Sequence, residues 1–515
     1  MINSRSKLGI KPIIVLKPKI TIVFRRTILV FFFACFQVFV FFPALSNPIP
    51  WSDDWGYIHY VNDSSRNIFH DAMAAGRPIL GFVDQFAYQN AFVASNLVVL
   101  QLLSLTALLL LQLAIYSKLI KSGFGQQISL FVSLAFILIP GIQGYVYFLS
   151  CFPYSWACLL GYLSYGYINS TTRYRALEGS IFFVISFLTY PAGAMFYFLG
   201  YIIDYTSRFK QECTFRSNMT HLLTIFLKMA ACSAASMLIA RIARSVYGIE
   251  QAARIELINS LESFVEKAVW TATRLFVSEF RVFSVASPSP SRAAIEVFLL
   301  LILFVIVILR PFSGLTWNRA LNFSLLLVTP LLGALPNLLI LENQFEFRTL
   351  TSTFAMSLIL WGFCLHQIFK KLLESATLKK RYSFKNTNNL TGLVCTLLLL
   401  LAISHVQRDS TNLWITPSLD RDAITQESLQ NIKNMDSSSI CMVIPEEVYV
   451  PLSKLGVYSM RSDLVSSWVP EPYMLQQLTR FELNANRKIT VVKNKESCEP
   501  FSLLMDYSSL SGKGL

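Results

Sequence analysis

The chain has 515 residues, of which 54% are hydrophobic and 14% are charged. Soluble domains carry about 25% charged residues, so this composition predicts a membrane protein and excludes an ordinary soluble domain. The formal net charge is +14, but the Lys and Arg residues lie in short clusters between hydrophobic runs. Such clusters are typical of the cytoplasmic loops of membrane proteins, so no nucleic-acid partner is predicted.

The first hydrophobic run follows a basic N-terminal segment. Residues 1–26 hold seven Lys or Arg residues and no acid, which predicts that this segment is cytoplasmic. Residues 27–45 form the first predicted span. The Ala44-Leu45-Ser46 sequence at its end resembles a signal-peptide cleavage site. The apolar run is nearer to a full bilayer crossing than to a short signal core, so we expect it to be retained.

An acidic pair follows at once, in the sequence Trp51-Ser52-Asp53-Asp54-Trp55-Gly56-Tyr57. Trp and Tyr prefer the membrane interface, and a carboxylate held there partly out of water becomes more basic. A carboxylate in that position suits proton transfer with a substrate whose tail lies in the lipid. A structural interpretation stays open, because Ser52 and the two acids also favour a helix start and the tryptophans suit interface anchors.

The rest of this loop, residues 46–91, contains one predicted helix. It runs from Ser64 to Ala75 and stops at Gly76, before Arg77-Pro78. Further spans are predicted beyond the loop, at residues 92–117, 128–148, 154–169, 218–246, 293–309, 320–341, 350–369 and 388–406.

The stretch 179–206 decides the topology. Basic clusters precede it at Arg173 and follow it at Arg208, and both are cytoplasmic only if the chain crosses out and returns at Tyr190-Pro191. Each half then has about 16 residues, roughly 24 Å, which is short for a 30 Å hydrocarbon core. Counting both halves, the chain has about eleven transmembrane helices and an extracytoplasmic C-terminus.

Two further segments are predicted outside the membrane. The loop 247–291 has apolar residues at helical spacing among charges, which predicts amphipathic helices on the membrane surface. Residues 407–515 are polar with short apolar runs, which predicts a small extracytoplasmic α/β domain. Cys441 and Cys498 form a disulfide if that side is oxidising, although two unrelated buried thiols fit equally well.

This order of parts resembles the GT-C superfamily of membrane glycosyltransferases over residues 27–406. It is most similar to the bacterial polytopic glucosyltransferases that decorate O-antigen of lipopolysaccharide or other cell-envelope polymers. The matching features are the motif 53–57, Gly76-Arg77-Pro78, Tyr190-Pro191, the amphipathic loop 247–291 and Phe347-Arg348-Thr349. The tail 407–515 adds no matching motif.

The resemblance implies an inverting enzyme with a polyprenyl-phosphate sugar as donor, working at the outer face of the inner membrane. The acceptor is then a glycan or lipid of the cell envelope, the sugar is a hexose such as glucose, and membrane lipids surround the protein. A small flippase and a donor synthase are the partners that it suggests. A divalent cation, Mg²⁺ or Mn²⁺, is compatible with this chemistry, but the sequence contains no metal-ligand spacing.

Candidate site residues follow from the same resemblance. One of Asp53 and Asp54 takes the proton of the acceptor hydroxyl, because adjacent side chains point in different directions and only one can face the substrate. Arg348 and Arg77 bind the donor phosphate, with an acidic partner for Arg348 and helix capping for Arg77 as the alternatives. The substrate contacts proposed beside them are Trp55, Tyr57, His59 and Tyr190, for which interface or surface positions are the alternatives.

Three rival functions stay open at this point. A polymerase or ligase of lipid-linked polysaccharide also has many spans. A polysaccharide or lipid transporter (a flippase) predicts charged residues within several facing spans, whereas the acids of this chain concentrate in one loop. A non-catalytic scaffold would leave the acidic pair without a purpose.

Overall fold

The structure is a computed structural model of the whole chain, and part of it can be described. The described residues are 18–46, 53–62, 67–90, 97–210, 213–252, 256–269, 317–340, 347–374, 384–409, 416–432 and 439–443, with 488–492, 503–506 and the single residues 48, 50, 473, 474, 478, 497 and 498.

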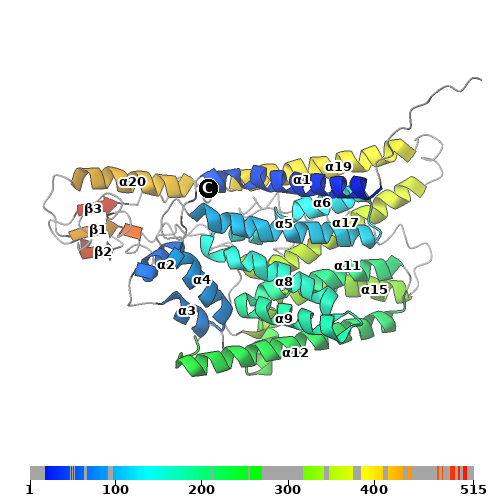
Figure 1. Ribbon diagram of the computed structural model, residues 1–515, viewed down its shortest axis with the longest axis horizontal. Helices are drawn as coiled ribbons and strands as arrows, with labels where there is room; N and C mark the ends of the chain where they lie inside the picture. The colour runs from blue at the N-terminus through cyan, green and yellow to red at the C-terminus, as the bar shows by residue number, and fades with distance from the viewer. Residues whose placement is uncertain are drawn as a thin grey trace, which may run out of the picture.

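Long helices lying roughly side by side form the main body, and a small sheet lies at one end of it (Figure 1). The helices of the first half are α1 (Pro18–Ser46), α2 (Asp53–Asn62), α3 (Ile68–Ala74), α4 (Pro78–Asn90), α5 (Leu97–Lys121), α6 (Gln126–Phe136), α7 (Pro140–Tyr147), η2 (Leu149–Cys151) and α8 (Phe152–Ile168). Those of the second half are α9 (Arg173–Thr189), α10 (Pro191–Ala194), α11 (Tyr197–Lys210), α12 (Phe215–Tyr247), α15 (Trp317–Val328), η4 (Thr329–Ala334), α16 (Leu335–Leu339), η5 (Phe347–Leu350), α17 (Thr351–Glu374), α19 (Phe384–Asp409) and α20 (Thr416–Ile432).

Several of these helices are long and apolar enough to cross a bilayer. Five described helical segments meet that condition, or six if the bent pair α6 and α7 counts as one span. The chain is therefore a multi-pass membrane protein. The predicted number of eleven spans is not confirmed, and the predicted span 293–309 lies outside the described residues.

The predicted span 128–148 is occupied by two helices with a bend between them. Helices α6 and α7 meet at an angle of 48°, with a break before Pro140. Proline has no backbone N–H and cannot continue a helix, but it is well placed in the first turn of a new one. After the bend, α7 packs against η5, which carries Arg348.

The predicted reversal at Tyr190-Pro191 is present. Helix α9 runs antiparallel to α8, since the Ser186 hydroxyl donates to the Ala157 carbonyl at 2.7 Å while Gly179 lies against Ile168. After Pro191 the chain turns back, and α10 and α11 follow α8 in the same direction, with Gly193 against Ala157. The core of the bundle forms around these three chain segments.

The predicted α/β domain is also present. The strands β1 (Ser439–Val443), β2 (Lys488–Val492) and β3 (Leu503–Asp506) form a parallel sheet in the order β2-β1-β3, beside α20. Parallel neighbours need crossover connections, as in α/β folds. Cys441 on β1 is joined to Cys498 in a disulfide, so the first of the two alternatives that the sequence left open holds.

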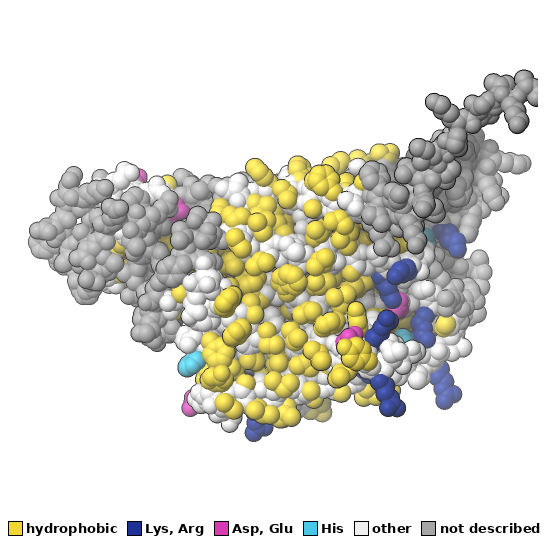
Figure 2. Space-filling view, in the orientation of Figure 1, with side chains coloured by type: hydrophobic (Ala, Val, Ile, Leu, Met, Phe, Trp, Pro, Cys, Tyr) yellow, Lys and Arg dark blue, Asp and Glu magenta, His cyan; other side chains and the backbone are white. Residues whose placement is uncertain are grey.

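Hydrophobic and basic side chains occupy different parts of the surface along the long axis of the molecule. Figure 2 shows hydrophobic side chains over the middle of the helical body and a group of Lys and Arg side chains at the end away from the sheet. That arrangement fits a bilayer around the middle of the bundle. In the second predicted outside loop, residues 261–269 are helical, and residues 270–291 lie outside the described residues.

Candidate active site at the acidic end

The acidic motif begins helix α2 and lies with α3 and α4 at the end of the bundle that carries the sheet (Figure 1). The predicted helix 64–75 was wrong at its start. Asn67 is extended and accepts a hydrogen bond from the Phe69 N–H, so α3 begins at Ile68. Gly76 has a φ of +73°, a left-handed conformation that ends α3 and lets α4 start at Pro78.

Asp54 is fully buried and holds three hydrogen bonds. Its Oδ1 accepts from the Tyr88 hydroxyl at 2.9 Å and from the Ser150 N–H at 2.7 Å, and its Oδ2 accepts from the Leu149 N–H at 3.1 Å. The two backbone donors belong to the helical turn that leads into α8, where an anion is stabilised by unpaired N–H groups. Asp54 therefore fastens α2 to the start of α8.

Asp84 on α4 is a second acid at this place, and sequence reasoning missed it. Its side chain is 1% exposed, and neither carboxyl oxygen has a hydrogen-bond partner among the described residues. Burial, and then the nearby negative charge of Asp54, raise the pKa of this carboxyl well above its usual value. A carboxyl in this environment favours its neutral form.

Tyr88 joins the two acids. It lies one helical turn after Asp84 on α4 and donates to Asp54, and the Tyr57 ring packs edge-on against it with centroids 5.4 Å apart. Burial and the charge of Asp54 raise the pKa of the Tyr88 hydroxyl, so it stays protonated and keeps donating. Tyr57 thus supports the acidic site through Tyr88.

Arg77 enters the same region from the turn between α3 and α4. Its Nη1 donates to the Tyr154 hydroxyl at 3.5 Å, and its guanidinium lies 5.3 Å from the centre of the Tyr190 ring. The Tyr154 and Tyr190 rings are stacked at 3.8 Å. The break at Tyr190 therefore supplies the aromatic surface on which Arg77 rests.

Arg348 belongs to η5, which packs against α7. The Tyr145 hydroxyl of α7 donates to the Arg348 carbonyl at 2.7 Å, and the guanidinium lies 5.6 Å from the centre of the Phe148 ring. Tyr154 interacts electrostatically with Arg77, Arg348 and Asp84. The structure thus brings together Asp54, Arg77, Arg348 and Tyr190, which lie far apart in the sequence, and adds Asp84 to them.

Trp55 connects this site to the C-terminal domain. Its side chain is 6% exposed and packs edge-on against the Tyr473 ring, with centroids 5.0 Å apart. The Tyr473 hydroxyl is bonded to Thr425 and Asp422 of α20 at 2.7 and 3.0 Å. The α/β domain therefore lies at the same end of the molecule as the acidic motif.

For the two remaining predicted residues, the structure describes only the backbone. Asp53 and His59 lie on the α2 backbone, and their side chains are outside the described residues. Within the described part of the chain, no three His, Cys, Asp or Glu residues come together.

Comparisons with protein families and with curated proteins find no match to this chain. Among solved structures, the chain is similar to the oligosaccharyltransferase of Archaeoglobus fulgidus, crystallised with zinc and sulfate, at 13% identity and a TM-score of 0.31. The match covers 92% of this chain and 62% of that protein, so the chain spans less than two thirds of its length. At this low TM-score the likeness establishes neither the fold nor the activity of this chain.

Proposed function

We propose that the chain is an inverting membrane glycosyltransferase. It moves a hexose, with glucose as the first candidate, from a polyprenyl-phosphate carrier to O-antigen or another glycan or lipid of the cell envelope. The reaction takes place at the outer face of the inner membrane, where the donor lipid and the acceptor meet.

The observation that supports this proposal is that helix α2, which begins with Asp53 and Asp54, lies at the same end of the bundle as Arg77 and Arg348. Arg77 donates to the Tyr154 hydroxyl, Arg348 and Asp84 interact with Tyr154 electrostatically, and Asp54 lies near Asp84. A transfer from a phosphate leaving group needs both kinds of residue. The cations stabilise the phosphate as its charge develops, and a carboxylate removes one proton from the acceptor.

The reaction balances with these groups alone. A carboxylate takes the proton of the acceptor hydroxyl, and the oxygen attacks the anomeric carbon from the face opposite the phosphate. The new C–O bond forms as the bond to the phosphate oxygen breaks, and the electron pair leaves with polyprenyl phosphate. Arg77 and Arg348 hold that phosphate, since guanidinium groups match its oxygens in geometry and charge.

The hydrogen bonds of Asp54 support different roles for the two adjacent acids. Three donors occupy the Asp54 carboxylate, which is fully buried and fixes α2 in place. An acceptor hydroxyl finds little free lone-pair capacity there. We therefore assign the base to Asp53 and the positioning of its helix to Asp54.

The test uses separate Asp53→Asn and Asp54→Asn variants, assayed for sugar transfer from a polyprenyl-phosphate hexose in membranes with matched protein levels. Asp53→Asn should lower kcat on the order of a hundred-fold or more with unchanged thermal stability, because a general base contributes about 10²–10⁴-fold. Asp54→Asn should lower both activity and thermal stability, since it weakens three charge-assisted hydrogen bonds. Full activity in the Asp53 variant would refute the assignment of the base.

Arg348→Lys is the companion test for the phosphate. A lysine keeps the charge but loses the planar pair of donors, so KM for the donor should rise while binding of the acceptor is unchanged. A product with many added sugars in the same assay would instead favour a polysaccharide polymerase. Retained activity in EDTA would exclude a requirement for Mg²⁺ or Mn²⁺.

A further inference from the structure

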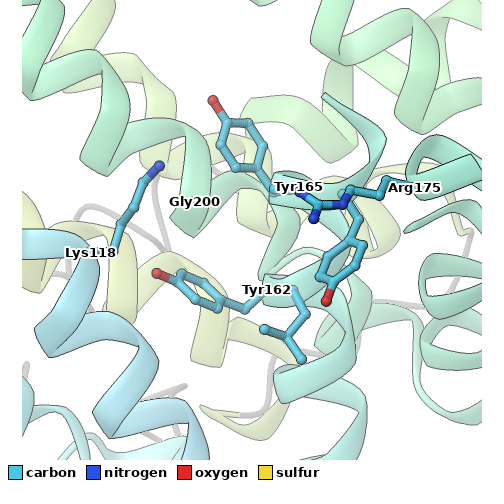
Figure 3. Close-up of a pocket in the computed structure, with 8 residues that line it drawn as sticks. Lys118, Tyr162, Tyr165, Arg175 and Gly200 are labelled. Atoms are coloured by element: carbon cyan, nitrogen blue, oxygen red, sulfur yellow. The ribbon is translucent and has the colours of Figure 1, made fainter. Parts of the chain in front are cut away.

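A cavity of about 330 Å³ lies at the opposite end of α8 from the acidic site (Figure 3). Asp54 accepts a hydrogen bond from the Leu149 N–H, just before α8 begins. The cavity, in contrast, is lined by Tyr162, Tyr165 and Gly166 from the last turns of α8. Helix α8 has 17 residues and is about 25 Å long at 1.5 Å per residue. The cavity therefore belongs to the other membrane boundary and is a separate site.

Cations from two helices border this cavity. Lys118 comes from the last turn of α5 and Arg175 from the first turn of α9, and Figure 3 shows them extending from different sides of the space. Lys118 is neutralised by Asp204 of α11, with Nζ and Oδ1 2.6 Å apart. Among the described residues Arg175 has no acidic partner, so the cavity carries one uncompensated positive charge.

The other walls suit a headgroup joined to lipid chains. Tyr167 offers a hydroxyl that has no hydrogen-bond partner among the described residues. The remaining lining is an apolar side chain, Leu163, and two glycines without side chains, Gly166 and Gly200. On α9, a stripe of exposed apolar residues begins next to Arg175, at Tyr174, Leu177 and Ile181. Residues at this spacing share one helix face, which would lie against acyl chains.

From this geometry we propose that the cavity binds the headgroup of an anionic phospholipid. The single positive charge of Arg175 matches the single negative charge of a phosphodiester. The Tyr167 hydroxyl donates to a phosphate or glycerol oxygen, and the acyl chains run along the apolar face of α9. The site holds a lipid at the membrane boundary away from the acidic end, and it takes no part in sugar transfer.

The experiment compares lipids on the purified, delipidated full-length protein in detergent. Retention is measured by native mass spectrometry, and the melting temperature is followed in parallel. The probes are phosphatidylglycerol, phosphatidylcholine, glycerol 3-phosphate and inorganic phosphate. Phosphatidylglycerol should be retained and should raise the melting temperature, whereas the other three should do neither.

Three variants locate the effect. Arg175→Gln should weaken retention of phosphatidylglycerol on the order of ten-fold, the loss of one charge-assisted contact. Arg173→Gln is the matched control, because Arg173 is exposed two residues away and does not line the cavity. Gly166→Leu fills the cavity without changing charge, and it should fold because a Cβ at Gly166 meets no atom within 4 Å.

Four outcomes would overturn the proposal. Equal retention of phosphatidylcholine would remove the role of charge, and an equal shift with inorganic phosphate or glycerol 3-phosphate would assign the cavity to a soluble phosphate. An equal loss in Arg173→Gln would mean that the basic surface acts as a whole. Undiminished retention in Gly166→Leu would place the lipid elsewhere.

Discussion

Asp84 shows how strongly a single side chain depends on its tertiary surroundings. It has an acidic neighbour, no hydrogen-bond donor among the described residues and almost no exposure. A carboxylate in that position loses its hydration and gains no compensating interaction. The carboxyl therefore costs folding free energy whenever it is ionised.

We expect Asp84→Asn to stabilise the protein at neutral and alkaline pH. The pKa of Asp84 is raised well above 3.8 in the folded state, so the folded protein holds the proton to higher pH than the unfolded chain does. The free energy of unfolding then falls as the pH rises from about 4 through the folded-state pKa. The advantage of the asparagine should vanish near pH 4 and grow as the pH rises, which thermal unfolding in detergent measures.

Asp71→Asn is the matched control, because Asp71 is an exposed acid on the neighbouring helix α3. That variant should follow the wild type across the same pH range. An Asp84 variant that is less stable than the wild type at every pH would show that the carboxylate is ionised and partnered.

Some residues of the candidate site could be predicted from the sequence, and others could not. Asp54, Arg77 and Arg348 could be chosen because they lie in the short motifs on which the resemblance to GT-C glycosyltransferases is based. Asp84 does not, because an acid on a short interface helix is usually solvated. The available signal was Pro78 as a helix start, which would have placed Asp84 and Tyr88 on one face of α4.

At the scale of elements, the packing of α8 against the break at Tyr190-Pro191 fixes the site. A Cβ built at Gly161 would come within 2.5 Å of the Gly193 carbonyl oxygen and 3.0 Å of the Ala194 Cα. Both contacts are backbone atoms, which cannot move aside as a flexible side chain can. Close approach here holds the Tyr190 ring against Tyr154.

Gly161→Ala should therefore destabilise the protein by about 1–3 kcal/mol, the usual cost of overpacking a core. The same substitution at Gly166, five residues along α8, meets open space and should be neutral or should stabilise by up to about 1 kcal/mol through helix propensity. Thermal unfolding of the two variants in one detergent measures the difference. Equal stability would mean that α10 does not pack on α8 as described.

The charge and hydropathy patterns of the sequence predicted some of these elements and missed others. The reversal at Tyr190-Pro191 could be predicted because basic clusters on both sides demand an even number of crossings. The bend before Pro140 was missed although the proline is visible, since a continuous apolar run reads as one span. The contact of α7 with η5 joins residues some two hundred positions apart, and no local pattern encodes it.

At the scale of the molecule, the acidic site is a meeting of the membrane bundle and the C-terminal domain. Tyr473 is fully buried, and its hydroxyl is held by α20 while its ring contacts Trp55. Trp55 is the residue next to Asp54 on α2. The C-terminal domain therefore contacts α2 through Tyr473.

Tyr473→Ala should lower kcat for sugar transfer on the order of ten-fold, since removal of the ring leaves α2 free to shift and small displacements of a catalytic group are costly. Tyr473→Phe keeps the ring against Trp55 and should retain most of the activity. Val491→Ala on β2 is the control, because Val491 is 45% exposed and belongs to the same domain. Transfer assays at matched protein levels compare the three, with donor and acceptor KM measured separately. A Tyr473→Ala enzyme with wild-type kcat would mean that the domain only neighbours the site and does not position α2.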